Sequence, residues 1–225
     1  TLDGTTTSIA ALMANMGADG KISLREAITA ANNTANGSGG PDRIAFGISG
    51  TGLHTINLGS ALPNITDVVV IDGTTDDSFA ANGNLPAIAL NGASVTSGDG
   101  LHLMSGASGS TVRGLVIQGF ANGYGVNIDN SANNQIVGNY IGTTLAGTAA
   151  VANFRGLYLS GAAATGNVIG GSTAADRNLI SGNSNDGVSI NGASLNTVIG
   201  NIVGLNAAGT AALGVALRPG APAPG

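Results

Sequence analysis

The chain of 225 residues contains no cysteine and no tryptophan, and only 3% of its residues are aromatic. The lack of cysteine excludes disulfides and thiolate metal ligands. Because 43% of the residues are nonetheless hydrophobic, we expect a core of stacked Val, Ile, Leu and Ala. No apolar run reaches the length of a membrane span, which argues against membrane insertion. The chain starts with neither Met nor a signal-like segment, so we expect a mature or trimmed product.

Charged residues are also scarce. They make up 8% of the chain, with 7 Lys plus Arg against 12 Asp plus Glu, for a net charge of −5. The cations are scattered from Lys21 to Arg218 and form no basic stripe, so we expect no nucleic-acid partner. A low-charge composition rich in Ser, Thr, Asn and Gly is common among exported proteins, and we expect a secreted or cell-surface location.

The chain contains several internal sequence repeats. One six-residue frame, Asn followed by three residues and Gly-Asn, occurs at residues 134–139 (NQIVGN), 178–183 (NLISGN) and 196–201 (NTVIGN). Two further matches, residues 125–128 (GVNI) with 187–190 (GVSI) and residues 147–150 with 209–212 (both GTAA), are each displaced by 62 residues. Internal repeats of this kind indicate a solenoid.

The short apolar runs fit three columns, one run per column in each turn. The first column takes residues 112–114, 136–138, 168–170 and 198–200, each closed by Gly; the second takes residues 115–117, 140–141, 179–180 and 202–203; the third takes the pairs 126/128, 157/159, 188/190 and 215/217. Strands this short must stack turn on turn at roughly 4.8 Å. We therefore predict an all-β fold, a right-handed parallel β-helix of three columns over residues 41–217.

Strict alternation in the third column assigns its two faces. Val188 and Ile190 should point inward, as Val126 and Leu157 do, and the residues between them should point outward. The outward residues are Asn127, Tyr158 and Ser189, and His102, between Leu101 and Leu103, belongs to the same row.

Asn recurs at the corners between strands. Asn and Gly tolerate the left-handed backbone of a tight bend, and Asn side chains repeated at one corner can hydrogen-bond to each other from turn to turn. We predict one ladder from Asn134, Asn167 and Asn196, and a second from Asn139, Asn183 and Asn201.

Residues 1–40 have a different pattern and should form an N-terminal cap. Ser23 and Glu26 have the spacing of a capping box, and the stripe of Leu24, Ala27, Ile28 and Ala31 predicts a helix of about ten residues. A second helical stripe contains Ile9, Leu12, Met13 and Met16. Such a cap would cover the first turn, whose core and strand edge are otherwise open.

The segment from Asn15 to Glu26 also resembles an EF-hand calcium loop. Asn15, Asp19 and Glu26 stand where ligands belong, at the first, fifth and twelfth positions. Gly17 occupies another ligand position, however, and Asn15 replaces the usual Asp. We favour the capping box alone, with calcium as the alternative and no other cofactor expected.

A family resemblance supports the predicted fold. Residues 23–28 (SLREAI) are similar to the Cys-Ser-Leu-Arg-Glu-Ala motif at the start of many bacterial exported β-helix proteins, with Ile22 at the cysteine position. The similarity continues at residues 53–56 (LHTI), 60–63 (SALP), 71–74 (IDGT) and 139–143 (NYIGT). The resemblance implies a bacterial, exported parallel β-helix, but fold alone supplies no chemistry.

Candidate catalytic groups are few. His102 and Tyr158, on one outer face with Arg113 and Arg155 at nearby corners, could bind or deprotonate a sugar. We expect Asp72, Asp76 and Asp77 to form a solvated turn, and His54 to be the outward residue of an early strand.

Three functions remain open. The first is a non-catalytic structural or adhesive module; the second is a carbohydrate-active lyase or hydrolase; the third is a carbohydrate-binding module that uses Tyr140 and Tyr158. We favour the first, because it requires no special residues. Residues 218–225 read as a Pro/Ala-rich tail or linker that cannot cap the last turn. The open C-terminal turn would accept either another copy, joined head to tail into a filament, or a further domain.

Overall fold

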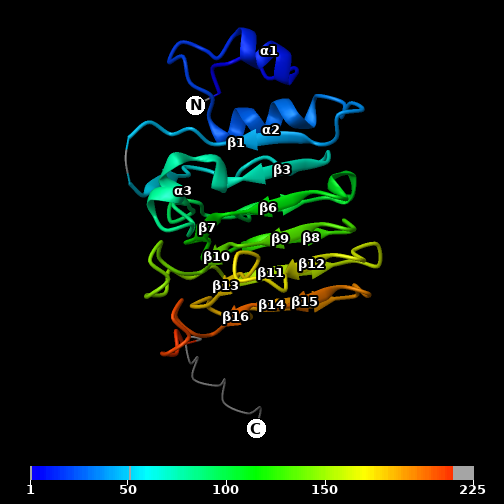
Figure 1. Ribbon diagram of the computed structural model, residues 1–225. Helices are drawn as coiled ribbons and strands as arrows, with labels where there is room; N and C mark the ends of the chain where they lie inside the picture. The colour runs from blue at the N-terminus through cyan, green and yellow to red at the C-terminus, as the bar shows by residue number, and fades with distance from the viewer. Residues whose placement is uncertain (1, 51, 215–225) are drawn as a thin grey trace.

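The computed structural model describes residues 2–50 and 52–214, and their strands form parallel sheets along one stack (Figure 1). The first sheet contains β1 (Asp42–Ala45), β3 (Val69–Asp72), β6 (Thr111–Arg113), β9 (Gln135–Val137), β12 (Val168–Gly170) and β15 (Thr197–Ile199). The second contains β2 (His54–Asn57), β4 (Ile88–Asn91), β7 (Leu115–Gln118), β10 (Tyr140–Ile141), β13 (Leu179–Ile180) and β16 (Ile202–Val203). The third contains β5 (Leu101–Leu103), β8 (Tyr124–Asp129), β11 (Arg155–Ser160) and β14 (Val188–Asn191).

Each strand pairs in parallel with its counterparts in neighbouring turns, so the described chain is an all-β parallel solenoid, as predicted. Residues in equivalent positions stack: Leu101, Val126 and Leu157 are in register, and all are buried. The core is aliphatic, with Phe120 its largest fully buried side chain. No helix in these ranges combines the length and apolar character that a membrane crossing needs.

The first column contains one error of register. We aligned the runs by their closing glycines, but Ile169 rather than Val168 pairs with Ile136 and Val198. Ile169 is fully buried, whereas Val168 is only half-buried. Aligning the glycines would shift the strand by one residue and point Val168, instead of Ile169, into the core. The register observed is the one that buries the larger side chain, Ile169.

The first asparagine ladder is confirmed. The Asn134 side chain donates to Asn167 Oδ1 at 2.8 Å, and the Asn167 side chain donates to Asn196 Oδ1 at 2.9 Å. The backbone N–H of Ser110 extends the ladder by donating to Asn134 Oδ1 at 3.0 Å. All three asparagines lie at the corner before the first sheet.

The second predicted ladder is wrong at one position. Asn139 and its backbone N–H donate to Asn178, which donates to Asn201, so Asn178 replaces the predicted Asn183. Asn183 accepts from Asn153 at 3.1 Å and forms a third ladder at another corner. The reason is that the frame at residues 178–183 encloses a strand of the second sheet, whereas the other two frames enclose strands of the first.

The N-terminal helices lie at one end of the stack, at the top of Figure 1. Helix α2 (Leu24–Asn32) follows a complete capping box between Ser23 and Glu26, and it buries Leu24, Ile28 and Ala31 against the core. Helix α1 (Ile9–Ala14) buries Leu12, but Met13 and Met16 are exposed, contrary to the predicted stripe. The helix ends before Met16, so the apolar face is only one turn long.

Within the described residues, three short helical segments interrupt the turns: η1 (Gly73–Thr75), α3 (Asp77–Ala81) and η2 (Ser105–Ala107). The last strands, β14, β15 and β16, lie at the opposite end from the cap (Figure 1). Val188 is half-buried and Ile190 is 47% exposed, so the prediction that Ile190 is interior is wrong for the described chain, in which β14 ends its sheet. The predicted strand at 215–217 and the tail at 218–225 lie outside the described residues.

Candidate functional site

The outer face of the third sheet contains the predicted row. His102 is in register with Asn127, Asn127 with Tyr158, and Tyr158 with Ser189. His102 Nδ1 lies 3.6 Å from Asp99 Oδ2, and its Nε2 lies 3.9 Å from Asp129 Oδ2. The structure thus brings together two carboxylates and an imidazole that the sequence pattern had not connected.

Tyr158 belongs to an aromatic cluster beside that row. Its ring lies 4.6 Å from the Tyr124 ring, centroid to centroid, and the guanidinium of Arg155 lies within 5.7 Å of the rings of Tyr124, Phe154 and Tyr158. Arg155 Nε also donates to Asp186 Oδ2 at 2.7 Å. Burial lowers the pKa of Arg155, but the hydrogen bond to Asp186, the negative charge of Asp186 and the interaction with Tyr124 together outweigh burial and raise the pKa.

The side chains of this face are largely engaged with each other. Asn191 donates to the Tyr158 hydroxyl at 2.9 Å, and Asn127 donates to Asp99 at 2.9 Å. Asn127 Oδ1 and His102 Nε2 are buried and have no hydrogen-bond partner in the described chain. The stacked rings and the cation–π contacts hold neighbouring turns together. These contacts should make this side of the solenoid rigid.

The acidic segment near β3 is not the predicted solvated turn. Asp72 and Asp76 are buried, and only Asp77 is exposed. Asp72 accepts from Arg43 and, at 2.6 Å, from Arg113 Nη2. Burial raises the pKa of Asp72, but the hydrogen bonds from Arg113, Thr74 and Arg43 outweigh it and bring the pKa to about 2. The Asp72 carboxylate therefore links β3 to the neighbouring strands β1 and β6.

His54 is also placed differently from the prediction. It is in register with the core residue Ile88, on the inward side of β2, and its side chain is only 14% exposed. Its Nε2 lies 3.7 Å from Asp76 Oδ1. The alternation of apolar and polar residues over 53–58 was too short to predict whether the His54 side chain would point inward or outward.

The residues proposed for calcium lie in the N-terminal cap. Glu26 is buried, and its two carboxylate oxygens accept from the N–H groups of Asp3, Gly4 and Ser23 at 2.8–2.9 Å. Asn15 Oδ1 accepts from Gly17, and Asp19 Oδ1 accepts from Lys21. Glu26 therefore uses its oxygens to hold the N-terminal segment, rather than leaving them for a bidentate calcium contact.

A groove crosses the edge between the first and second sheets, and no motif in the sequence predicted it. In two successive turns this corner is very short: Gly114 alone joins β6 to β7, and Gly138 and Asn139 join β9 to β10. The turns on either side carry insertions, residues 73–87 before β4 and residues 171–178 before β13. The short corners form the floor and the insertions form the walls of a groove of about 360 Å³.

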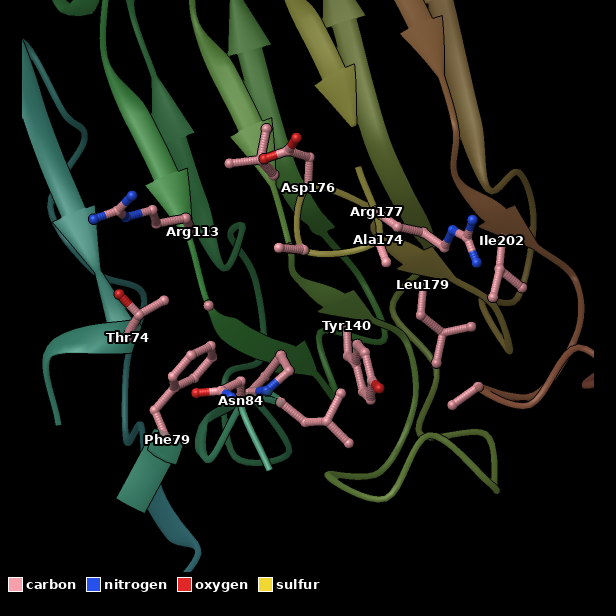
Figure 2. Close-up of a pocket in the computed structure, with 17 residues that line it drawn as sticks. Thr74, Phe79, Asn84, Arg113, Tyr140, Ala174, Asp176, Arg177, Leu179 and Ile202 are labelled. Carbon is pink, nitrogen blue, oxygen red and sulfur yellow. The ribbon is translucent and has the colours of Figure 1, made fainter. Parts of the chain in front are cut away.

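Figure 2 shows Thr74 and Phe79 on one side of this groove and Ala174 and Arg177 on the other, with Tyr140 between them. Gly114 and Gly138 have φ values of +70° and +64°, a backbone conformation that favours glycine. Their lack of a side chain also lets the two walls lie close to the floor. A Cβ at Gly114 would lie 2.6 Å from Thr74 Cγ2, and one at Gly138 would lie 2.7 Å from Ala175 O. Larger residues would therefore push the walls away from the floor.

The floor of the groove has its own small apolar cluster, outside the main core. Tyr140 packs there with Ala89, Val116 and Leu179 on the outer face of the second sheet. Burial raises the pKa of Tyr140, and its hydroxyl, like that of an ordinary tyrosine, is protonated at neutral pH and can donate. No group of three or more His, Asp or Glu side chains suitable for a metal ion occurs in the described ranges.

Comparison with known proteins adds no assignment: no family model matches the chain, and no match was found among curated proteins or solved structures.

Proposed function

We propose that this chain is a non-catalytic structural or adhesive module of an exported bacterial protein, located outside the cell or on its surface, which associates end to end. We further propose that its solenoid is a right-handed β-helix. Connections between parallel strands of one sheet are right-handed in about 98% of cases, and every turn of this coil is such a connection. The export and bacterial origin rest on the resemblance of residues 23–28 described above.

The observation that carries the proposal is the distribution of exposed apolar side chains. Of the twelve large hydrophobic residues exposed in the described chain, four lie on the N-terminal cap and six in the last turn. Those on the cap are Leu2, Met13, Met16 and Ile22; those in the last turn are Ile190, Leu195, Val198, Ile199, Val203 and Leu205. The remaining two of the described residues are Leu53, directly before β2 in the first turn, and Leu85, in the insertion before β4.

Apolar surfaces gathered at both ends favour contact between ends. The two ends differ, one helical and one made of strand edges, so the contact would be heterologous. A heterologous contact that does not close generates an open filament rather than a dimer. The sides of the rod, where side chains are paired with each other, would remain exposed along such a filament.

Light scattering over a concentration series tests the proposal. We expect the mean mass to rise with concentration, and Leu195→Asp to suppress the rise. Leu195 is 84% exposed with φ +58°, a region that Asp tolerates well, so the substitution should not impair folding. Leu85→Asp, which places the same charge at an exposed apolar site between the two ends, is the control. A mass that stays monomeric at every concentration would contradict the proposal.

A further inference from the structure

We propose that the groove between the insertions at 73–87 and 171–178 binds an acidic saccharide, a chain of uronate residues lying across the rod between the two walls. This inference concerns the side of the rod and does not depend on association through its ends. It rests on the shape of the groove, on its apolar surfaces and on its charges.

The shape fits a linear chain. The strands that follow the two insertions, β4 and β13, are separated in the sheet by β7 and β10, which places the walls three strand spacings apart. At about 4.8 Å per spacing this is roughly 14 Å before side chains are counted. Insertions in a solenoid that gather on one face commonly form its binding surface.

Apolar faces line the groove on its floor and on one wall. The Phe79 side chain and the Pro86 ring belong to the first insertion, and the Tyr140 ring belongs to the floor. The CH-rich faces of sugar rings pack on such surfaces, while the Tyr140 hydroxyl offers a hydrogen-bond donor. Within the described chain that hydroxyl makes no hydrogen bond, so it can donate to a ligand.

Two guanidinium groups provide the charge. Arg113 is held by its Nη2 on the buried carboxylate of Asp72, and Arg177 donates through Nε to Gly200 O at 3.0 Å. The Nη atoms of Arg177 have no hydrogen bond to the described residues and no ion pair with the adjacent Asp176, whose Oδ2 accepts from Thr173. A guanidinium with free N–H groups is suited to bidentate contact with a carboxylate.

The location of these cations is unusual for this chain. The chain has a net charge of −5 and only 7 Lys plus Arg, yet two of its arginines line the same groove, against one carboxylate there, that of Asp176. An anionic ligand is therefore favoured here over a neutral or cationic one.

A saccharide fits better than an acidic peptide. Peptides commonly add as a strand to an unpaired sheet edge. The floor strands have no such edge, because β7 pairs with β4 and β10, and β10 pairs with β7 and β13. Recognition must therefore come from side chains and ring faces.

Titration calorimetry with short oligouronates tests the inference, using the same oligomers with methyl-esterified carboxyls and short poly-glutamate for comparison. We expect the oligouronate to bind, the ester to bind at least tenfold more weakly, and Arg177→Ala to weaken oligouronate binding about tenfold. Lys21→Ala, which removes the same charge from an exposed position in the cap, should leave binding unchanged.

A second variant tests the apolar wall: Phe79→Ala should weaken oligouronate binding without altering the unfolding transition of the solenoid by more than a few degrees. The inference is overturned if no oligouronate binds at millimolar concentration, if Arg177→Ala and Lys21→Ala have equal effects, or if poly-glutamate binds as tightly as the oligouronate. Phe79 lies away from both ends of the rod, so the effect of Phe79→Ala on binding is independent of the mass measured by light scattering. Arg177 contacts Gly200 in the last turn, so the mass of Arg177→Ala is measured as well.

Discussion

The side-chain amide of Asn134 donates to the side-chain oxygen of Asn167 at 2.8 Å, across the boundary between two turns. The same oxygen also accepts from the backbone N–H of Asn134 at 2.9 Å, and Asn167 itself donates to Ser131 O and to Asn196 Oδ1. Each buried asparagine thus replaces backbone hydrogen bonds that a corner cannot make. Packing of the aliphatic core is non-directional and does not determine the backbone conformation of the corners. The hydrogen bonds of the asparagine ladders determine it.

We expect Asn167→Ala to reduce the free energy of unfolding by about 2–4 kcal/mol, because it leaves the buried backbone N–H of Asn134 and the Ser131 carbonyl without partners and removes one of the two side-chain hydrogen bonds of Asn134. Denaturant unfolding followed by circular dichroism measures the loss. Asn196→Ala, at the end of the same ladder and only half-buried, should cost less than Asn167→Ala. Equal losses would mean that the ladder acts only through turn propensity.

Glu26 should make the cap sensitive to acid. Burial raises the pKa of Glu26, but the N–H groups of Gly4, Ser23 and Asp3 outweigh it and lower the pKa to about 2 from its ordinary value of 4.5. A depressed pKa in the folded state stabilises the protein above pH 4.5 and ceases to do so as the pH falls to about 2. The stability of the parent should therefore fall across this interval.

Glu26→Gln isolates that contribution. The variant cannot form a carboxylate, so the stability difference between parent and variant should be largest near neutral pH and shrink as the pH falls from about 4.5 to about 2. Thermal unfolding at a series of pH values measures the difference. A difference that stays constant with pH would contradict the role of an ionised Glu26.

Removal of divalent ions should leave the melting temperature unchanged, because the Glu26 oxygens are occupied by N–H donors. Differential scanning calorimetry with and without chelator checks this. A fall of several degrees that added calcium restores would revive the loop from Asn15 to Glu26 as a calcium site.

Ser23→Ala should lower the free energy of unfolding by about 1 kcal/mol, since it removes the side chain that accepts from the Glu26 N–H at 3.3 Å. Ser23→Thr keeps a hydroxyl in that place and should recover most of the loss. Unfolding by denaturant compares the three proteins. If Ser23→Ala is as stable as the parent, Ser23 does not contribute as an N-cap.

The sequence predicted the features of the fold that recur from turn to turn and those that depend on local spacing. The alternation around Val126 and Leu157 fixed the inward face of the third sheet, and the spacing of Ser23 and Glu26 fixed the start of α2. It could not distinguish equivalent corners, because the same frame at residues 178–183 encloses a strand of a different sheet. Contacts between distant parts of the chain, such as Arg43 with Asp72 or His102 with Asp129, depend on register and were not visible.

The groove illustrates the same limit. Its walls are departures from the repeat, and an insertion reads locally as a loop. Only the stacking of turns places residues 73–87 and 171–178 on either side of Gly114 and Gly138. An indirect signal was present, because the corners before β7 and β10 are much shorter than those before β4 and β13, and this difference in length could be sought in other solenoids.

End-to-end association is tested most directly by cross-linking, which the absence of cysteine in the chain makes unambiguous. Met13→Cys places a thiol on the cap and Leu195→Cys places one in the last turn, both at exposed sites. With a short bis-maleimide, we predict that a mixture of the two single variants forms a cross-linked dimer, that neither single variant alone does so, and that the double variant forms a ladder of oligomers. Cross-linking of Leu195→Cys to itself, or of no combination at all, would contradict the account.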